Sequence, residues 1–383
     1  MEGIELLNIF KEHKFDYFTG VPDSTFKGFI NELYSADGIT HRLAVNECEA
    51  AFLAGGYYVS TGKIGVCYMQ NAGLGKVVNP ITSYTTPYSI PMLLLIGWRG
   101  EPEPIDKDKD EPQHIHMGDI MLRLLGLLKI PFDILSNDLG TIKAQVRVAK
   151  EYMELNKKPY ALVIKRKNDI SPGTKFSAMD EFFQGEKGGK ISRADVVKGV
   201  VHNMKPEDII VSTTGKVSRE LYDLRADRGE GHGKDFLNVG GMGGALAQAT
   251  EIALQHPDRK VYCIDGDGAA LMQLGTMATA GHYHPRNLIH VLIDNGGYQS
   301  TGNQPGISDS LHFCALAITC GYKVCGSAYF YKQFYEYLED FKKGEGPFLV
   351  VVHCGKYCSN KLGRPRTSPQ ENKRSFMENL GVK

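Results

Sequence analysis

The stretch "YCIDGDGAALMQLGTMATA" (262–280) places a carboxylate between two glycines where a strand is expected to become a helix. The apolar run that ends at Gly266 is typical of a buried strand, and helical periodicity begins after Gly268. A helix N-terminus attracts anions, and phosphate is the anion most often bound there. We therefore expect Asp267 to share this turn with a phosphate through a divalent metal ion.

A second expected strand supports this interpretation. The stretch "LIHVLIDNGGYQSTG" (288–302) ends its apolar run at Asp294 and Asn295. The carboxyl ends of parallel strands meet at the edge of a sheet where ligands bind. Side-chain oxygens of Asp267 and Asn295 and the backbone carbonyl of Gly297 could therefore hold one ion, and phosphate oxygens and water would complete a magnesium octahedron. Gly-Asp-Gly alone is equally compatible with a bare turn.

The composition is that of an ordinary globular protein. The 383 residues are enough for two domains, and hydrophobic residues make up 42% of them. Lys plus Arg and Asp plus Glu are 44 each, so we expect no nucleic-acid or membrane partner. The N-terminus lacks a signal-peptide pattern, and a cytoplasmic protein is expected. The eight cysteines are interpreted as reduced thiols, because the Cys354 and Cys358 pair has no second pair to complete a zinc site.

Both halves of the chain alternate short apolar runs with helical periodicity, which predicts an α/β fold with parallel sheets. Residues 168–190 carry Pro, Gly and charges without an apolar period. We therefore expect two doubly wound domains, 1–170 and 191–383, joined by a linker at 171–190. The expected strands are apolar runs bounded by turn residues, at 15–21, 41–45, 63–69, 89–98, 160–165, 208–215, 260–268, 288–297 and 347–353.

Gly-Asp-Gly followed by an Asn-containing strand end resembles the signature of the thiamine-diphosphate enzymes. The resemblance implies that Asp267, Asn295 and the Gly297 carbonyl hold Mg²⁺ and the cofactor diphosphate. It also implies a bulky apolar residue that bends the cofactor, which would be Met242 in "GGMGG", although Met242 could equally be a core residue. Further cofactor contacts are expected near the same strand ends, from Thr214, Gly215, Gly266, Gly268 and Ala269.

The segment "AVNECEAAFLAGGYYVSTGKIGVC" (44–67) resembles the part of this family in which a glutamate begins a helix. The matching residue is Glu47. Without the resemblance it is an acid in a first helical turn, which is a favourable position in itself. The resemblance implies that its carboxylate binds the aminopyrimidine ring and favours the imino tautomer. That tautomer deprotonates the thiazolium carbon, and the resulting ylide attacks a ketone. We take the neighbouring Glu49 for a solvated or packing residue.

The absence of a middle domain narrows the resemblance to compact decarboxylases that act on 2-oxo acids with a second anionic group. In this family the cofactor contacts two chains, which implies a homodimer or larger homo-oligomer. A nicotinamide dehydrogenase is disfavoured, because "TGVPDSTFKG" (19–28) lacks the glycine pattern of a dinucleotide-binding turn. A non-catalytic cofactor-binding protein is the other alternative, and it would not need Glu47.

A doubly anionic substrate beside a diphosphate requires cations or neutral donors around it. Arg99 and His114 are the candidate cations, and either could be structural. Asp23 is an acid near anions, so we expect it to orient donors or to handle a proton. The full set of candidate substrate residues comprises Asp23, Ser24, Asn71, Arg99, His114, Thr301 and Asn303.

Overall fold

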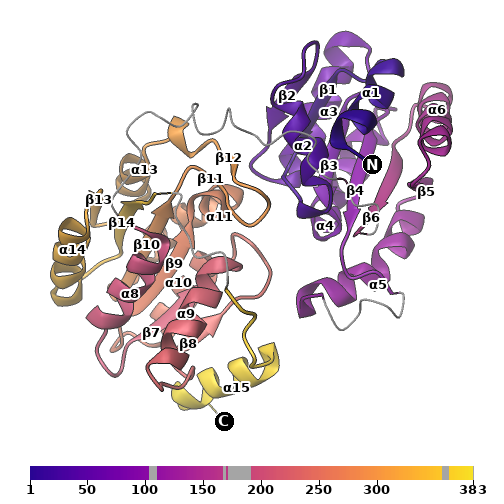
Figure 1. Cartoon of the computed structure of the whole chain (residues 1–383). Coiled ribbons are helices and arrows are strands. Elements are labelled where there is room, and N and C mark those ends of the chain that lie inside the picture. Colours follow the sequence, from indigo (N-terminus) through magenta and orange to yellow (C-terminus); the bar gives the residue numbers. More distant parts are fainter. Residues whose placement is uncertain (103–109, 167–169, 171–190, 356–361, 383) are drawn as a thin grey trace. The chain divides into compact units, whose positions relative to one another are not determined.

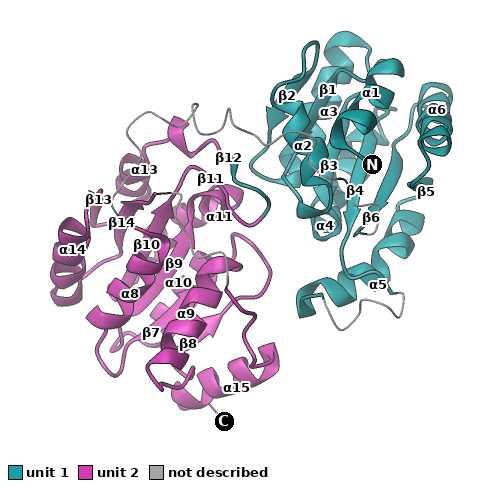
Figure 2. Cartoon of the chain, viewed as in Figure 1, with its two compact units in different colours: residues 1–178, 301–304 teal, residues 179–300, 305–383 magenta. Residues whose placement is uncertain are grey.

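Two parallel sheets organise the chain, one in each of its two compact units (Figures 1 and 2). A computed structural model describes residues 1–102, 110–166, 170, 191–355 and 362–382. Unit 1 comprises Met1–Ala178 with Thr301–Gln304, and unit 2 comprises Met179–Ser300 with Pro305–Lys383. The predicted linker at 171–190 and Cys358 lie outside the described residues.

Unit 1 contains a six-stranded sheet in the order β2-β1-β3-β4-β6-β5, and all of its neighbouring strands are parallel. Its strands are β1 (Tyr17–Gly20), β2 (Thr40–Leu43), β3 (Val66–Gln70), β4 (Leu93–Trp98), β5 (Phe132–Ile134) and β6 (Tyr160–Lys165). Its helices are α1 (Gly3–Glu12), α2 (Lys27–Leu33), α3 (Glu47–Thr61), α4 (Leu74–Pro80), α5 (Pro112–Leu127) and α6 (Leu139–Asn156), with short helical turns at Ser24–Phe26, Asn71–Gly73 and Ile81–Thr85.

The central strand β4 shows why this sheet is covered on both faces. Every residue of β4 is buried, so its sequence is a continuous apolar run rather than an alternating one. Successive side chains point to opposite faces: Leu93 and Leu95 join one hydrophobic core, and Leu94 and Ile96 join another. A sheet with a core on each face is doubly wound.

Unit 2 repeats this plan in the order β13-β14-β10-β9-β7-β8. Its strands are β7 (Ile209–Ser212), β8 (Asp235–Leu237), β9 (Val261–Gly266), β10 (Leu288–Asp294), β13 (Val324–Ala328) and β14 (Phe348–His353), and a small hairpin pairs β11 (Gly297–Tyr298) with β12 (Gln304–Pro305). Its helices are α8 (Arg193–Asn203), α9 (Lys216–Asp227), α10 (Ala245–Gln255), α11 (Asp267–Met272), α12 (Gly275–Tyr283), α13 (Phe313–Cys320), α14 (Tyr331–Lys343) and α15 (Pro369–Asn379), with a short turn at Ser308–Ser310.

The predicted architecture, two doubly wound parallel-sheet domains without a middle domain, is confirmed. Two details differ from the sequence-based expectation. The single helix expected after Gly268 is divided into α11 and α12, and three edge strands, β5, β8 and β13, were not expected. No helix in the described part of the chain is long and apolar enough to cross a membrane.

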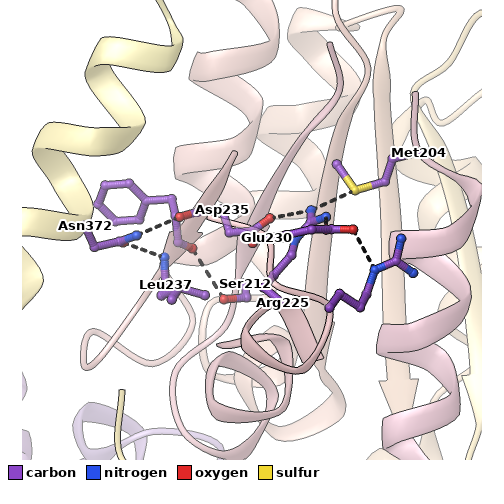
Figure 3. A network of polar contacts seen from close by, with 9 residues as sticks. Met204, Ser212, Arg225, Glu230, Asp235, Leu237 and Asn372 are labelled. Atoms are coloured by element: carbon purple, nitrogen blue, oxygen red, sulfur yellow. Dashed lines mark hydrogen bonds and ion pairs between the residues drawn. The ribbon is translucent and has the colours of Figure 1, made fainter. Parts of the chain in front are cut away.

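A buried polar network joins the edge strand β8 to the C-terminal helix α15 (Figure 3). The Arg225 guanidinium donates to both carboxylate oxygens of Asp235, at 2.8 and 2.9 Å, and to Glu230 at 2.6 Å. The Asn372 side chain donates to the Asp235 carbonyl at 2.9 Å and accepts from the Leu237 amide at 3.0 Å. Asn372 thereby takes the place of a neighbouring strand at the edge of the sheet.

Candidate functional site

Asp267 lies where β9 turns into α11, at the carboxyl edge of the sheet of unit 2. Its residue surface is only 5% exposed. The backbone amides of Gly268 and Gly296 and the hydroxyl of Ser308 interact with the carboxylate and stabilise its negative charge. Because Gly296 belongs to the turn after β10, the predicted ligand Asp267 is brought next to the other predicted ligands, Asn295 and Gly297.

Burial and a second acid oppose the ionisation of Asp267. Burial raises the pKa of Asp267 to about 7, and the negative charge of Asp294 contributes to the increase. Asp294 itself accepts from Ser308 at 2.9 Å and lies 3.1 Å from Nδ1 of His353. Among the described residues, no lysine or arginine lies within ion-pair distance of Asp267. A divalent cation bound here would compensate this charge and so fits the site.

The other two predicted metal ligands lie in the turn after β10. The Asn295 side-chain oxygen accepts from the Gly297 amide at 3.1 Å, and both residues are partly exposed. Because β10 pairs in parallel register with β9, this turn lies beside the end of β9. The adjacent strand ends therefore carry a carboxylate, an amide and a backbone carbonyl, which are the kinds of oxygen donor that Mg²⁺ prefers.

The predicted cofactor contacts surround this strand end. A Cβ atom at Gly268 would lie 3.0 Å from Tyr298 and 3.5 Å from the terminal methyl group of Met242. Met242 is partly exposed and lies over the start of α11, which does not suit the alternative of a core residue. The remaining predicted contacts lie on β7, β9 or the turns after them: Thr214 is partly exposed, Gly215 has φ 89° at the start of α9, Gly266 ends β9, and Ala269 is buried in α11.

Glu47 is the first residue of α3 in unit 1 and is 6% exposed. The preceding residue, Asn46, caps the helix by accepting from the Glu49 amide at 2.9 Å. The exposed Glu49 carboxylate accepts from the Val45 amide at 2.7 Å. Glu49 is therefore used in capping the helix, whereas Glu47 is directed into the unit.

Two residues after β3 surround the Glu47 carboxylate. A Cβ atom at Gly73 would lie 2.5 Å from Cγ and 2.6 Å from Oε1 of Glu47, so the position requires glycine. The Lys76 ammonium lies 3.3 Å from Oε2. Oε2 is buried and has no hydrogen-bond partner within the described residues. A buried acid with one free acceptor fits a ligand that brings its own N–H group.

Asp23 is fully buried, and both of its carboxylate oxygens are bonded. One accepts from the Thr25 amide at 2.8 Å and the other from the Gln70 side chain at 2.8 Å. A Cβ atom at Gly97 would lie 2.4 Å from Asp23. Of the two roles expected from the sequence, these contacts favour the orienting one, since Asp23 connects the turn after β1 to the ends of β3 and β4.

The two candidate cations of unit 1 differ from expectation in their surroundings. Arg99 donates to Asp110 through Nε at 3.2 Å and Nη2 at 2.6 Å, and Nη1 lies 3.3 Å from the Ser24 hydroxyl. Its positive charge is therefore compensated within the protein. Asn71 is fully buried and donates to the Arg99 carbonyl at 2.7 Å, and His114 is 8% exposed near the start of α5.

Thr301 and Asn303 lie in the turn between β11 and β12. The Thr301 hydroxyl donates to the side chain of Gln304 at 2.7 Å. Asn303 is exposed and has φ 61°, a left-handed conformation that asparagine tolerates better than most residues. These contacts explain the shape of the turn and assign no substrate contact to either residue.

Four residues of the two sites were not expected from the sequence. Asp110 lies in the charged run "DKDKDE" (106–111), and nothing in the sequence pairs it with Arg99. Lys76 follows a glycine turn without any motif. Ser308 and His353 contact Asp294 from segments distant in sequence, and only the strand order brings them together.

Each unit is a doubly wound sheet with a buried acid at the start of a helix near its carboxyl edge, an arrangement suited to ligand binding in α/β enzymes. A family model described as "Thiamine pyrophosphate enzyme, N-terminal TPP binding domain" matches residues 4–116. One described as "Thiamine pyrophosphate enzyme, C-terminal TPP binding domain" matches residues 222–352. The chain belongs to the thiamine pyrophosphate (thiamine diphosphate) enzymes, and its relatives include decarboxylases of this family.

Three relatives illustrate the range of similarity. Phosphonopyruvate decarboxylase of Streptomyces hygroscopicus is 32% identical over 377 residues, covering 94% of this chain and 89% of that protein. Sulfopyruvate decarboxylase of Methanosarcina acetivorans is 25% identical over 350 residues, covering 86% of each. Sulfopyruvate decarboxylase subunit beta of Methanocaldococcus jannaschii is 45% identical over 112 residues, covering 29% of this chain and 56% of that subunit.

Proposed function

We propose that the chain is a phosphonopyruvate decarboxylase. It removes carbon dioxide from 3-phosphonopyruvate without oxidation and leaves phosphonoacetaldehyde, a step of phosphonate biosynthesis such as that of 2-aminoethylphosphonate. The observation that carries the proposal is the 32% identity to a phosphonopyruvate decarboxylase along nearly the whole length of both chains. The site residues described above supply the parts that such a reaction needs.

Bound thiamine diphosphate supplies a nucleophilic carbon and an electron sink for the loss of carbon dioxide. Asp267, Asn295 and the Gly297 carbonyl hold Mg²⁺ and, through it, the diphosphate. Met242, which lies against the start of α11, would pack against the cofactor. Glu47 would accept a hydrogen bond from the pyrimidine ring and so act as the acid that activates the bound cofactor.

We assign the anionic groups of the substrate to the group of side chains around Arg99. Ser24 and Asn71 offer neutral donors or acceptors there, and Arg99 offers a guanidinium that Asp110 already compensates. An anion that binds Arg99 directly would have to compete with Asp110 for the same N–H groups. Recognition therefore combines neutral donors with a partly neutralised arginine.

Sulfopyruvate decarboxylase is the second candidate, because a subunit of such an enzyme is 45% identical to part of this chain. Purified protein with thiamine diphosphate and Mg²⁺ should be given phosphonopyruvate, sulfopyruvate and pyruvate in parallel, with carbon dioxide and aldehyde measured. We expect phosphonopyruvate to react much faster than the other two. Equal or faster turnover of sulfopyruvate would reverse the assignment.

We further propose that the active unit is at least a homodimer, with each cofactor shared between two chains. An apolar surface on α3 and the segment after α4 supports this. Phe52, Val59 and Tyr88 are 45%, 68% and 72% exposed, and the Tyr84 ring contacts both Phe52 and Tyr88 in tilted arrangements. Mixing Glu47→Gln with Asp267→Ala protein should restore activity, because a hybrid dimer contains one intact site. Full activity in a monomer would contradict this proposal.

A further inference from the structure

Lys76 is a cation beside the predicted catalytic acid, and the proposed reaction gives it no role. It lies in the first turn of α4, and its ammonium is 3.3 Å from Oε2 of Glu47. The Lys76 side chain is 32% exposed, whereas that of Glu47 is 9% exposed. One end of this ion pair is therefore fixed in the protein, and the other can reach solvent.

The contact with Lys76 compensates the charge of the Glu47 carboxylate but leaves Oε2 without a hydrogen bond among the described residues. The ammonium is within ion-pair distance of Oε2, yet this oxygen makes no hydrogen bond within the part of the chain that the structure describes. Gly73 lies close to the other oxygen, Oε1, where a Cβ atom would be only 2.6 Å away. A ligand that binds the Glu47 carboxylate thus binds the group that Lys76 faces.

We propose that Lys76 is an exchangeable internal counter-ion, which compensates Glu47 in the cofactor-free protein and moves to solvent when the pyrimidine ring binds. The inference rests on the proposed function. A buried carboxylate without a partner is costly, so a cation is useful while the cofactor is absent. A ring N–H and an ammonium compete for the same carboxylate once the cofactor is present.

The surroundings allow this exchange. Lysine has a flexible stem, and a third of the Lys76 side chain is already exposed. A Cβ atom at the preceding Gly75 would meet no other atom within 4 Å, so this turn of α4 is not tightly packed at that position. Lys76 is accordingly a positioning residue: it stabilises the empty site and weakens cofactor binding.

Measuring cofactor affinity tests whether Lys76 weakens or strengthens cofactor binding. Lys76→Met should bind thiamine diphosphate with Mg²⁺ about three- to thirtyfold more tightly than the parent, because no ion pair has to be broken. Without cofactor, the variant should melt at a lower temperature. Lys143→Met is the matched control, since Lys143 pairs with Glu12 and both side chains are more than half exposed. It should change neither quantity. A lysine that only supports the fold predicts weaker binding in Lys76→Met.

The reactivity of the Lys76 amine reports directly on whether its ion pair with Glu47 is broken. Acylation of Lys76, quantified in its peptide by mass spectrometry, should accelerate when cofactor and Mg²⁺ are added, whereas Lys143 should not respond. In Glu47→Gln, Lys76 should react fast with or without cofactor.

Two results would overturn the inference while leaving the proposed function intact: unchanged or weaker cofactor binding in Lys76→Met, and slower acylation of Lys76 in the parent on cofactor binding. If the parent chain bound no thiamine diphosphate, both the inference and the proposed function would be overturned.

Discussion

Two buried aspartates in unit 2, Asp235 and Asp267, differ in what lies opposite them. Asp235 is fully buried and faces Arg225 through two hydrogen bonds (Figure 3). Asp267 is 5% exposed and faces a second carboxylate, Asp294. Burial raises the pKa of both aspartates, but only at Asp235 does an arginine counteract the increase.

Under the proposed metal site, the difference separates an acid that stabilises the fold from one that binds a ligand. A buried acid whose partner is part of the chain contributes to a stable scaffold. One whose neighbours are also acidic destabilises the unliganded protein and is explained by a cation that comes from outside. Glu47 lies between these extremes, since its partner Lys76 is only partly buried.

The strongest test of this contrast is Asp267→Ala. Removing the charged ligand should weaken magnesium-dependent binding of thiamine diphosphate by at least about a hundredfold, while the thermal stability of the empty protein stays equal or rises. Calorimetric titration and thermal melts measure the two effects. Asp235→Asn is the control and should show the opposite pattern, with lower stability and cofactor binding retained by the folded protein. An unchanged titration in Asp267→Ala would remove this residue from the metal site.

Glu47→Gln should affect chemistry more than binding. The substitution keeps the size of the side chain and a hydrogen-bonding oxygen but removes the acid that shares a proton with the ring. Turnover should fall about 10²–10⁴-fold, with cofactor affinity changed far less. Hydrogen–deuterium exchange at the thiazolium carbon, measured without substrate, isolates this step. Exchange as fast as in the parent would direct attention to Glu49 instead.

Arg225→Met tests the scaffold side of the comparison. It leaves Asp235 buried without its cation, which should cost about 3–5 kcal/mol in the free energy of unfolding measured in urea. Arg228→Met is the matched control: Arg228 also pairs with Glu230, but both side chains are about one-third exposed, so the cost should stay below about 1 kcal/mol. A similar loss in the two variants would show that burial of the pair is not the cause.

The pH dependence of stability should reveal Asp267 in the empty protein. Its pKa rises from the ordinary value of 3.8 to about 7 on folding. Between these values the folded chain keeps a proton that the unfolded chain has lost, so the contribution to stability present at low pH is lost as the pH rises towards 7. The decrease should be about 1–4 kcal/mol and should flatten in Asp267→Asn. Saturating Mg²⁺ and cofactor should also reduce it, because they bind the ionised form. An equally steep decrease in Asp267→Asn would assign the effect to another group.

The sequence predicted the central strands better than the edges for a physical reason. Strands such as β4 and β10 are buried along their whole length, so their sequences are continuous apolar runs. The edge strands β5 and β13 are partly exposed and mix polar with apolar residues, and β8 is only three residues long. Short, half-exposed strands leave a weaker signal, although the edge strand β2 was expected at 41–45.

The predicted site residues show a similar limit. Asp267, Asn295 and Glu47 follow strands or begin helices, so local pattern and resemblance pointed to them. The partners that set their charge state come from elsewhere: Asp294 becomes a neighbour of Asp267 only because β9 and β10 pair, and Lys76 reaches Glu47 only because α3 packs on α4. Such contacts depend on the tertiary fold.

Asn372→Ala should have the smallest effect on stability. The place in the structure where the effect appears is as informative as its magnitude. The Asn372 side chain satisfies the Asp235 carbonyl and the Leu237 amide at the edge of the sheet. Removing it leaves two buried backbone groups without a partner, at a cost of about 1–2 kcal/mol in the free energy of unfolding. Hydrogen exchange at the Leu237 amide should accelerate, while cofactor affinity stays the same. Asn379 lies on the same helix as Asn372 and makes an exposed contact with Arg259. Asn379→Ala should change neither the hydrogen exchange at Leu237 nor the cofactor affinity. If Asn372→Ala weakened cofactor binding as well, the scaffold around Asp235 and the site around Asp267 would be energetically coupled, and the two aspartates could not be treated as independent.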